Sequence, residues 1–465
     1  MRISSTSDTI CALSTAPGTG AIAVIRLSGP AAFAVTAELF KPAEKNLDIL
    51  SAASHTIHLG IIGGETGMLD EVLVSIFRAP HSYTGEDVVE ISCHGSVYIQ
   101  QKLLELLLSR GLRMANPGEF TLRAFMNRKF DLSQAEAVAD LIASHSSTSH
   151  DLAIRQMRGG FSKKIHALRQ SLLEFTALIE LELDFSEEHM IFADRTNFQA
   201  LLDHILAELS ALTGSFSLGN VIKSGIPVAI IGKPNVGKST LLNVLLNEEK
   251  AIVSEIPGTT RDAIEDTIVI GGYSFRFIDT ARFRAAEDPI ETIRIGRTWG
   301  KISEGSIILY VFDATLQSFA DVMASVAEFR EYTAAGARTM ILVGNKMDKL
   351  KTLPKGFREF VEYDTVFVSG KRRENIHEIA EHLLKVVENT HVSDNTIVSN
   401  SRHYEALKRA HESVACVDEG LKDGISPDLL TTDLRSALYH LGEITGEVTT
   451  DEILGAIFSR FCIGK

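Results

Sequence analysis

Cysteine, tryptophan and net positive charge are all scarce in this sequence. Its 465 residues include one tryptophan and four cysteines, and the formal net charge at pH 7 is −14. The cysteines form no C-x-x-C pair and show no metal-site spacing, which favours a reducing cytosol over a disulfide framework. The acidic balance disfavours binding of nucleic acid through the overall field of the chain, and leaves that contact to a local basic patch or a basic partner.

Long apolar segments are missing too. The first residues, Met1–Asp8, lack the apolar core of a signal peptide, and no apolar run approaches the roughly 18 residues that span a bilayer. We therefore expect a cytoplasmic protein without a membrane anchor. With 45% hydrophobic and 23% charged residues, the chain is typical of soluble globular proteins, and its length predicts about three domains.

A glycine loop predicts a nucleotide site. Gly232–Ser239 follows the pattern G-x-x-x-x-G-K-S, between an apolar strand predicted at Ile226–Ile231 and a helix predicted over Thr240–Leu246. Such a loop directs backbone N–H groups and the positive end of a helix at an anion. We expect Lys238 to reach the β- and γ-phosphates and the Ser239 hydroxyl to bind Mg²⁺. The flanking strand and helix disfavour the alternative, a glycine turn that binds nothing.

A second motif selects the base. Asn345–Asp348 follows a strand predicted at Thr339–Val343, at the carboxyl edge where a parallel sheet binds its ligands. The Asp348 carboxylate can accept hydrogen bonds from N1 and N2 of guanine, whereas adenine would leave this acceptor unpaired. Ser369–Lys371 follows another predicted strand, Val366–Val368, and is placed to contact the base. GTP is therefore the predicted nucleotide.

Two further segments fit a GTPase. Asp279 follows a strand predicted at Phe275–Ile278 and is expected to act on Mg²⁺ from the second coordination sphere. Gly258–Asp262 occupies the place of a switch loop, in which Thr260 could add an oxygen to the metal shell. Four ordered motifs beside the expected strands predict a GTP-binding domain of alternating strands and helices.

The groups that orient the attacking water and stabilise the transition state are harder to identify from the sequence than the groups that bind the nucleotide. Phe283 stands near the position where Ras-type enzymes carry a glutamine that orients water, and it cannot form that hydrogen bond. Transition-state charge also needs a cation, and the residues leave four candidates open: Arg261, Arg284, an arginine from a partner and a bound metal ion.

The segments that flank this domain are of two kinds. Residues 1–125 mix short strands with a helix predicted at Ser96–Arg110, which indicates an α+β domain. From residue 131 the pattern is helical, and a capping box at Ser133–Glu136 is expected to open the first helix. The other predicted strands are Ile22–Leu27, Val72–Phe77, Val88–Ile91 and Ile307–Phe312, and the other predicted helices are 149–184, 197–212, 401–420, 426–445 and 450–461.

Helices on both sides of the α/β unit predict that this unit is inserted into one helical domain. Two separate helical bundles are the alternative. The predicted boundaries are residues 1–125 for the N-terminal domain, 126–218 for the first helical part, 219–388 for the G domain and 389–465 for the second helical part.

Six stretches match a known family: Ala21–Gly29, Ser82–Glu90, Pro117–Phe120, Gln134–Ala137, Gly258–Asp262 and Phe461–Lys465. Over essentially its full length the chain resembles the MnmE (TrmE) family of bacterial tRNA-modification GTPases, and the ending Phe-Cys-Ile-Gly-Lys is highly specific. The resemblance implies a multidomain α+β and α/β fold. Its parts are an N-terminal α+β domain that binds folate and dimerises, a helical domain from two segments and an inserted Ras-like P-loop G domain.

The resemblance further implies a role in tRNA modification. Such proteins work with the flavoprotein MnmG in a heterotetramer, which contacts tRNA and forms the aminomethyl or carboxymethylaminomethyl group at C5 of the wobble uridine. The carbon would come from 5-formyl- or methylene-tetrahydrofolate. The resemblance places folate at Arg26, Glu90, Lys129 and Lys465. Taken from the residues alone, Arg26 and Glu90 could instead form a structural ion pair.

The resemblance also supplies the missing cation, because such GTPases bind K⁺ in the site and dimerise through their G domains. It implies K⁺ ligands at Asn235, Ser254, Ile256 and Thr259, and a water-positioning role for Glu291, whose alternative is a solvated helix charge. The implied GTP-binding residues are Asn235, Val236, Gly237, Lys238, Ser239, Thr240, Ser254, Glu255, Ile256, Pro257, Gly258, Thr259, Thr260, Asp279, Thr280, Ala281, Arg282, Asn345, Lys346, Asp348, Ser369, Gly370 and Lys371, with Ser239 and Thr260 on Mg²⁺.

Two residues leave alternatives open. Arg282 stands where the family has glycine, so either switching and hydrolysis are altered or the arginine fits an allowed conformation. Cys462 is either a buried small hydrophobe or a reactive thiol near the folate. A prenylation box fits the ending poorly, since Gly464 and Lys465 depart from its pattern.

Two other functions compete with the family's role. A ribosome-assembly GTPase that binds rRNA would share the G motifs, but it usually adds an RNA-binding module, which is not evident in this sequence. A membrane-remodelling GTPase is disfavoured because no basic amphipathic anchor is evident.

Overall fold

A computed structural model describes residues 8–64, 67–184, 195–248, 265–279, 307–327, 339–352, 356–357, 363–388, 396–423 and 425–464. The chain divides into two compact units. The first comprises Met1–Ala139, Gln156–Gln170 and Leu438–Lys465, and the second comprises Asp140–Arg155 and Ser171–Ala437. The domain boundaries predicted from the sequence stay predictions.

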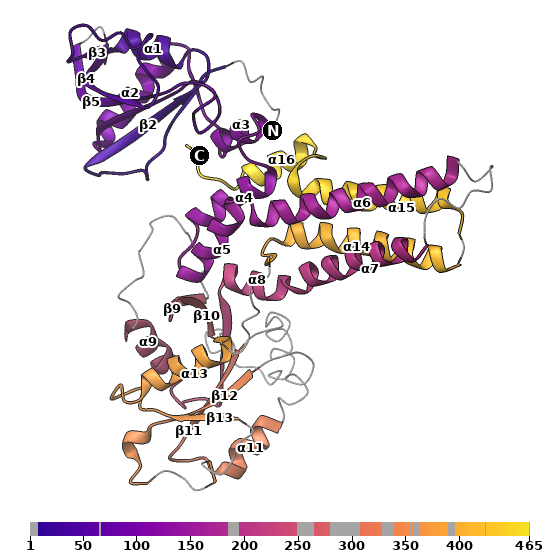
Figure 1. Cartoon of the computed structure of the whole chain (residues 1–465). Helices are drawn as coiled ribbons and strands as arrows, with labels where there is room; N and C mark the ends of the chain where they lie inside the picture. The colour runs from indigo at the N-terminus through magenta and orange to yellow at the C-terminus, as the bar shows by residue number, and fades with distance from the viewer. Residues whose placement is uncertain are drawn as a thin grey trace. The chain divides into compact units, whose positions relative to one another are not determined.

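The first unit contains an α+β domain built on one seven-stranded sheet (Figure 1). The strand order is β3-β4-β5-β6-β2-β1-β7, with β1 and β7 parallel and the other neighbours antiparallel. The strands are β1 (Ile10–Leu13), β2 (Ile22–Ser28), β3 (Phe40–Pro42), β4 (Thr56–Gly64), β5 (Gly67–Phe77), β6 (Val88–His94) and β7 (Arg113–Met114). Strands β2, β5 and β6 confirm the three strands predicted for this domain, whereas β1, β3, β4 and β7 were not predicted.

Two helices pack on one face of this sheet. They are α1 (Ala32–Leu39) and α2 (Val97–Ser109), and the second confirms the helix predicted at Ser96–Arg110. Alternate strand residues such as Ile25 and Val74 join Phe33 of α1 and Leu103 of α2 in one buried core. Strand side chains alternate between the two faces of a sheet, and the helices pack on one face. Ile57 and Leu59 of β4 point to the other face and are exposed.

The end of the chain packs against the start of this domain. Helices α3 (Glu119–Met126), α4 (Leu132–Ile142) and α16 (Asp451–Phe458) share a small core that includes Leu122, Leu132, Leu454 and Phe458. Beyond α16, the Cys462 carbonyl accepts a hydrogen bond from the backbone of Gly118 at 3.3 Å. The Gly464 carbonyl accepts another from the Ser14 hydroxyl at 3.2 Å.

The capping box predicted at Ser133–Glu136 is wrong, because the residue that caps the helix is Asp131, two positions earlier. Asp131 caps α4, since its carboxylate accepts bonds from the Gln134 backbone (2.9 Å) and from the Ser133 hydroxyl (2.7 Å). Gln134 reciprocates by accepting the Asp131 backbone N–H through its side chain at 3.1 Å. Asp131 thus fills the cap position of an equivalent box, while Ser133 lies buried inside the helix.

Two predicted helices are each divided. The helix predicted over 149–184 is α5 (Ser147–Met157) followed by α6 (Gly160–Asp184), because Gly159 takes a left-handed φ of 82° that a continuous helix excludes. The helix predicted over 197–212 is α7 (Arg195–Gly214), and a further helix, α8 (Phe216–Ser224), leads into the G domain. The boundary predicted between residues 218 and 219 falls within α8 and stays a prediction.

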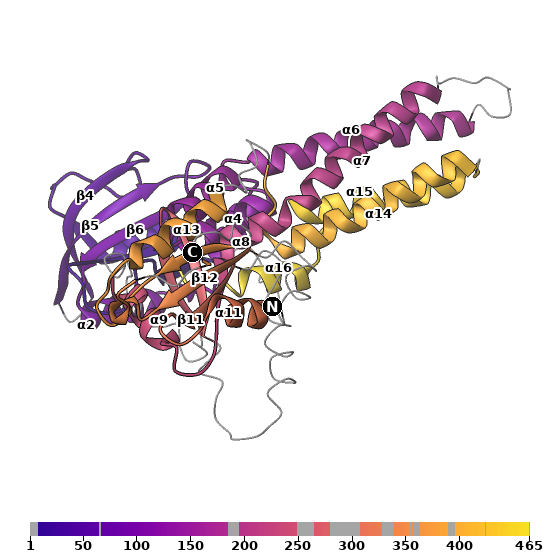
Figure 2. The same ribbon diagram turned by 90° about the horizontal axis from the view of Figure 1, so that it is seen from below.

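The second unit contains a six-stranded sheet of strand order β13-β12-β11-β8-β10-β9, in which the β9–β10 pair is antiparallel and the rest are parallel. Helices α9 and α13 cover one face and α11 the other, as Figures 1 and 2 show. The elements are β8 (Ile226–Ile231), α9 (Lys238–Glu248), β9 (Glu265–Ile270), β10 (Tyr273–Asp279), β11 (Ile307–Asp313), α11 (Phe319–Ala327), β12 (Thr339–Asn345), η3 (Met347–Lys349), β13 (Asp364–Phe367) and α13 (Ile376–Glu388).

The G domain is inserted within a helical region. Two of the later helices, α14 (Ser401–Asp423) and α15 (Pro427–Thr445), confirm the predicted ones, and α14 runs beside α7. Gln199 of α7 donates a side-chain bond to Asp418 of α14 at 2.8 Å. The chain enters and leaves the G domain at one place, since the Val398 backbone donates to the Ser215 hydroxyl at 3.0 Å. These contacts confirm one helical domain from two segments and not two separate bundles.

One stretch, Gln199–Ser224, is long and apolar enough to cross a membrane, by length and composition only. It consists of parts of α7 and α8, and Leu202, Ile205 and Leu209 within it are fully buried. Core helices of soluble proteins meet the same criteria, so this single stretch is weak evidence for a membrane.

Candidate functional site

The phosphate loop lies at the carboxyl end of β8, whose six residues are all buried. Gly232 has a φ of 147°, and a Cβ atom there would overlap the Val311 carbonyl of β11, so only glycine lets the loop leave the sheet at this point. Lys238, the first residue of α9, is 8% exposed and donates from Nζ to the carbonyls of Gly232 (2.7 Å) and Lys233 (2.9 Å). The loop therefore holds its own lysine inside the curve of the backbone.

The base motif is bonded directly to the phosphate loop. Asn345, at the end of β12, is 4% exposed, and its Nδ2 donates to the Val236 carbonyl at 2.8 Å. Its Oδ1 accepts from the backbone N–H groups of Lys346 (2.8 Å) and Gly370 (3.0 Å). Asn345 thus joins all three predicted loops through its side chain.

Asp348 is oriented by the third loop. Its Oδ1 accepts a hydrogen bond from the Ser369 hydroxyl at 2.8 Å. This bond, ahead of the opposing effect of desolvation, holds the pKa of the Asp348 carboxyl below its usual range. The carboxylate stays charged and keeps lone pairs for the N–H groups of a guanine base. Ser369 is itself fixed, because its backbone exchanges hydrogen bonds with that of Glu374 at 3.0 and 3.2 Å.

One residue of this site, Asp313, was not predicted from the sequence. Asp313, at the end of β11, accepts a hydrogen bond from Lys346 Nζ at 2.6 Å. Burial alone would raise the pKa of Asp313, but hydrogen bonds from Lys346 and Thr315 outweigh it and lower the pKa. An acidic residue at the end of a wholly apolar strand was the available signal, because a buried carboxylate requires a partner.

Many predicted residues lie outside the described part of the chain: Ser254, Glu255, Ile256, Pro257, Gly258, Thr259, Thr260, Thr280, Ala281, Arg282, Glu291 and Lys465. The same holds for Arg261, Phe283 and Arg284, and the backbone of Asp279 ends β10.

Of the predicted metal ligands, Ser239 and Asn235 lie in the described part of the chain, and their roles stay predictions. Ser239 is exposed in the first turn of α9, where an anion-bound Mg²⁺ would be reached. Asn235 is exposed with a left-handed φ of 62° and offers an amide oxygen that suits a hard cation such as K⁺. Among the described residues, no group of three or more His, Cys, Asp or Glu side chains could hold a metal ion.

Of the residues predicted to bind folate, Arg26 and Glu90 are in contact on the N-terminal sheet. Arg26 of β2 and Glu90 of β6 are cross-strand partners and form an ion pair at 2.8 Å, as the structural alternative supposed. The Arg26 guanidinium lies 5.1 Å from the centre of the Tyr83 ring and 5.6 Å from that of Phe120. Both charged side chains keep some exposure, 17% and 26%. Lys129 donates instead to the Pro80 carbonyl at 3.0 Å.

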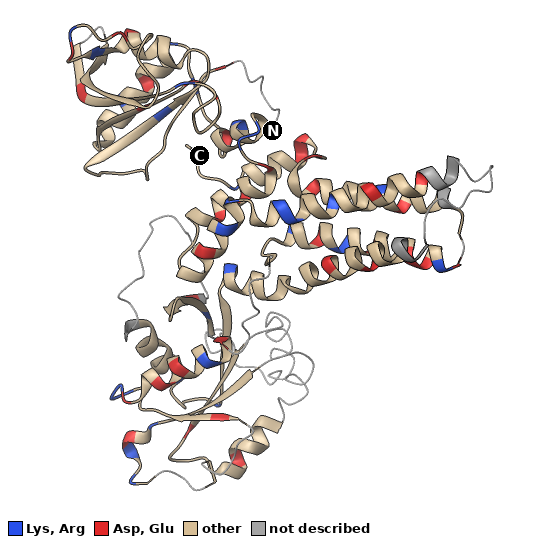
Figure 3. Ribbon diagram, viewed as in Figure 1, with Lys and Arg blue, Asp and Glu red and all other residues tan. Residues whose placement is uncertain are grey.

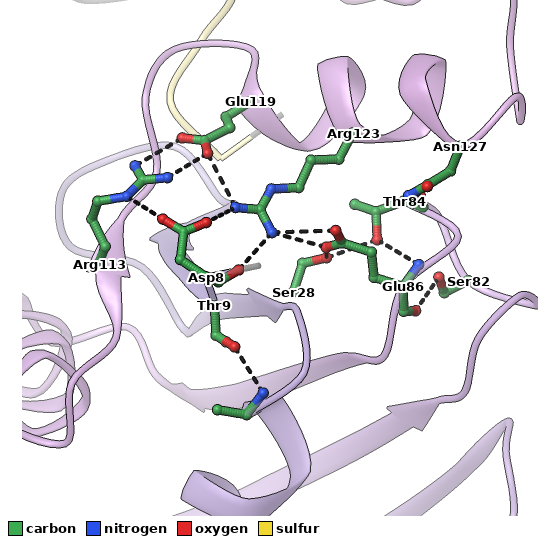
Figure 4. A network of polar contacts seen from close by, with 11 residues as sticks. Asp8, Thr9, Ser28, Ser82, Thr84, Glu86, Arg113, Glu119, Arg123 and Asn127 are labelled. Atoms are coloured by element: carbon green, nitrogen blue, oxygen red, sulfur yellow. Dashed lines mark hydrogen bonds and ion pairs between the residues drawn. The ribbon is translucent and has the colours of Figure 1, made fainter. Parts of the chain in front are cut away.

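Arg113 and Arg123 form a charged network with the carboxylates of Asp8, Glu86 and Glu119 (Figure 4). Arg123, 4% exposed in its side chain, donates to Asp8 (2.6 Å), Glu86 (3.0 Å) and Glu119 (3.2 Å). Arg113 adds bonds to Asp8 (2.7 Å) and Glu119 (2.6 Å). Ion pairs that are buried and multiply bonded fix geometry, so α3 is held against the loop that carries Tyr83, whose hydroxyl also bonds Thr121 at 2.9 Å.

The alternative of a buried Cys462 is wrong, because its side chain is exposed. The residue lies in the segment whose carbonyls bond Gly118 and Ser14. Burial of Phe461 and Gly464 on either side anchors the segment, and the thiol between them faces solvent. The exposed position leaves the reactive-thiol alternative in place.

The phosphate loop, the base motif and the sheet order together define a P-loop GTPase of Ras-like topology. Two family models match: the GTP-binding protein TrmE N-terminus over residues 9–129, and the MnmE helical domain over residues 132–462. A tRNA modification GTPase MnmE from Flavobacterium psychrophilum is 51% identical over 98% of this chain and 99% of its own length. The Bacteroides fragilis relative of the same name is 50% identical, with 98% and 99% covered.

The chain belongs to the MnmE family of tRNA modification GTPases. Among solved structures, the G domain of the T. maritima FeoB iron transporter is 22% identical over 35% of this chain and 98% of its own length. Its TM-score is 0.26, a likeness too weak to carry an argument.

Proposed function

We propose that this chain binds and hydrolyses GTP with Mg²⁺ and K⁺ and thereby supports modification of the wobble uridine of tRNA. One observation carries the nucleotide part: Asn345 bonds both the phosphate loop and the Ser369 loop, while Ser369 orients Asp348. Such a site offers backbone N–H groups to phosphates and a carboxylate to guanine. Mg²⁺, bound in part through Ser239, would neutralise phosphate charge during hydrolysis.

The role proposed for K⁺ rests on Asn235. Asn235 is exposed and has a left-handed backbone, and its amide oxygen suits K⁺. Turnover of GTP by the full chain should be compared in K⁺ and in Na⁺ at equal ionic strength. We expect strong K⁺ stimulation that Asn235→Ala abolishes. Equal rates in both salts would contradict the K⁺ proposal and leave GTP binding untouched.

Arg282 and Glu291 lie outside the described residues, and their roles stay predictions. We expect Arg282 to alter hydrolysis, because arginine lacks the backbone freedom of the family's glycine. Arg282→Gly should then raise K⁺-stimulated turnover, whereas an equal rate would show that arginine is accommodated. Glu291→Gln should lower turnover without loss of nucleotide affinity if Glu291 positions water.

The tRNA role would be shared with a flavoprotein partner, MnmG, and would use a one-carbon unit from 5-formyl- or methylene-tetrahydrofolate. Arg26, Glu90 and the half-buried Tyr83 present charge and an aromatic ring that fit such a ligand. Lys129 and Lys465 are proposed to meet its carboxylates. Titration of tetrahydrofolate against the full chain and Arg26→Ala tests this site, and equal affinity would contradict it.

The reaction itself is tested by deletion of the gene followed by mass spectrometry of tRNA nucleosides. Loss of the modified wobble uridine is expected, and normal modification would contradict the proposed role. A defect confined to ribosomal subunits would favour the alternative of a ribosome-assembly GTPase. Fractionation should place the protein in the cytoplasm, and recovery with membranes would contradict that expectation.

A homodimer is also proposed, and the open face of the N-terminal sheet supports it. Ile57, Leu59 and Leu73 on β4 and β5 are 66, 50 and 45% exposed, which is unusual for neighbouring apolar residues unless a partner covers them. Figure 3 shows the charged residues of β4 and β5 to be few beside those of the long helices. Sedimentation of Leu59→Glu should show a monomer if this face forms the dimer, and an intact dimer would exclude this face.

A further inference from the structure

Asp313 is a carboxylate to which neither the sequence motifs nor the family resemblance assigns a role. We propose that Asp313 is a positioning residue for the nucleotide: it holds Lys346 against the phosphate loop, and so makes the phosphate-binding and base-binding loops one rigid unit. The inference rests on the GTP binding proposed above, and goes beyond it by naming what keeps the two loops in register.

The topology places Asp313 between the two loops. β11 lies between β8, which precedes the phosphate loop, and β12, which precedes the base motif. These three strands are parallel, so their carboxyl ends meet at one edge of the sheet. Asp313 is the last residue of β11 and is paired with Asn345 of β12. A side chain at this point can reach both neighbours.

The two oxygens of Asp313 have different partners. Oδ2 accepts a hydrogen bond from Lys346 Nζ at 2.6 Å. Oδ1 accepts from the Thr315 backbone (2.9 Å) and from the Thr315 hydroxyl (2.6 Å), and so closes the turn after β11. The side chain of Asp313 is 6% exposed and that of Lys346 is 29% exposed, so the pair is partly shielded from water.

The Lys346 ammonium, held by Asp313, also bonds the phosphate loop. Its Nζ also donates to the Asn235 carbonyl at 2.9 Å. Asn235 and Lys346 both hold a positive φ, 62° and 69°, which residues other than glycine adopt uncommonly. A hydrogen bond between two such residues stabilises both conformations at once. Without the carboxylate, Lys346 would keep the Asn235 carbonyl but lose the group that fixes its position.

The plainer alternative is that Asp313 only caps the turn at Thr315. Two matched variants separate these roles. Asp313→Asn keeps an oxygen for Thr315 but presents an NH₂ group to Lys346, so the turn survives and the tether is lost. Thr315→Val removes the hydroxyl bond from the turn and leaves the contact between Asp313 and Lys346 intact.

The measurement is equilibrium binding and release of fluorescently labelled GDP by the full-length chain. We expect Asp313→Asn to weaken binding about tenfold, mainly through faster release, because a shielded charged pair is truncated. Thr315→Val should stay within about twofold of the unsubstituted chain. In a Lys346→Met background, Asp313→Asn should add nothing, since the two changes remove the same contact.

Three results would overturn the inference: equal binding by Asp313→Asn and the unsubstituted chain, equal losses in Asp313→Asn and Thr315→Val, or a full further loss in the Lys346→Met background. Asp313→Glu, which keeps the charge but lengthens the side chain, should recover part of the affinity and serves where Asp313→Asn does not fold. Failure of the unsubstituted chain to bind labelled GDP would instead contradict the proposed function.

Discussion

Ser369 donates a hydrogen bond from its hydroxyl to Asp348 Oδ1 at 2.8 Å, and so connects the loop after β13 with the base motif after β12. The bond orients the carboxylate expected to recognise guanine. It leaves the second oxygen, and further lone pairs on the first, available to a ligand. Selection of the base therefore depends on two loops that are distant in the sequence.

We predict that Ser369→Ala weakens GDP binding about three- to tenfold, because a hydrogen bond to a charged group contributes roughly 1 kcal/mol or more. The carboxylate would then adopt several orientations. Calorimetric titration with GDP measures the effect. Ser325→Ala is the control, since its exposed hydroxyl bonds the Asp321 carbonyl within α11. Equal affinities for both variants would show that Asp348 needs no support from Ser369.

A second prediction concerns Arg123. Arg123→Met leaves Asp8 and Glu119 paired with Arg113, and removes from Glu86 its ion pair with Arg123. Removal of one partner from a buried ion-pair cluster costs about 3–5 kcal/mol. Urea unfolding at pH 7.5 should show this loss. The control is Arg435→Met, which breaks the exposed pair with Glu180 and should cost less than about 1 kcal/mol.

The Arg123→Met effect should depend on pH. Burial alone would raise the pKa of Asp8 and of Glu119, but hydrogen bonds from Arg113 outweigh it at both, with help from Arg123, so both pKa values are lowered. A lowered carboxyl pKa stabilises the fold above the unfolded values, 3.8 and 4.5, and this contribution is lost as pH falls through the folded pKa. The difference between Arg123→Met and the unsubstituted chain should therefore begin to shrink only as the pH falls below the unfolded values of 4.5 and 3.8, and should disappear as it falls through the lowered folded pKa values. A constant difference would contradict this account.

The sequence predicted the G domain better than its surroundings, for a physical reason. β8, β11 and β12 are buried on both faces, so their apolar runs are continuous and mark the strands clearly. β4 carries exposed isoleucine and leucine on its open face, and β1 spans only four residues, so neither has a clear pattern.

The site was predicted in the same uneven way. Motif spacing identified Lys238, Asn345 and Asp348, because one ligand constrains all of them. It could not find Asp313, whose partner Lys346 lies 33 positions away. Nor could spacing decide between an ion pair and a ligand site for Arg26 and Glu90. That choice depends on which strands are neighbours, and only the fold brings β2 and β6 together.

A third prediction concerns the thiols. Cys416 and Cys462 are exposed, whereas burial raises the pKa of Cys11 and of Cys93 to about 11 in each case. Thiolates and not thiols react with disulfide reagents. We expect two thiols of the native chain to react rapidly with Ellman's reagent at pH 8, and the other two only after unfolding. Cys462→Ser should remove one fast equivalent, and an unchanged count would contradict the exposed position of Cys462.

The last prediction tests the start of α4. Asp131 bonds the Gln134 backbone at 2.9 Å and also accepts the Ser162 hydroxyl of α6, so it closes the helix and connects it with α6. Loss of a cap costs about 0.5–2 kcal/mol, and loss of the contact to Ser162 adds to that. Asp131→Ala should therefore destabilise the chain by about 2 kcal/mol in urea unfolding.

Ser133→Ala is the matched variant, because it tests the cap that the sequence pattern favoured. The Ser133 hydroxyl donates to Asp131 and satisfies no helix N–H, so its removal leaves the cap in place. We expect a loss of at most about 1 kcal/mol, the usual contribution of one hydrogen bond. If Ser133→Ala destabilised the chain more than Asp131→Ala, the cap would lie at Ser133 after all. The smaller loss is expected because Asp131 accepts the Gln134 N–H directly and Ser133 acts only through Asp131.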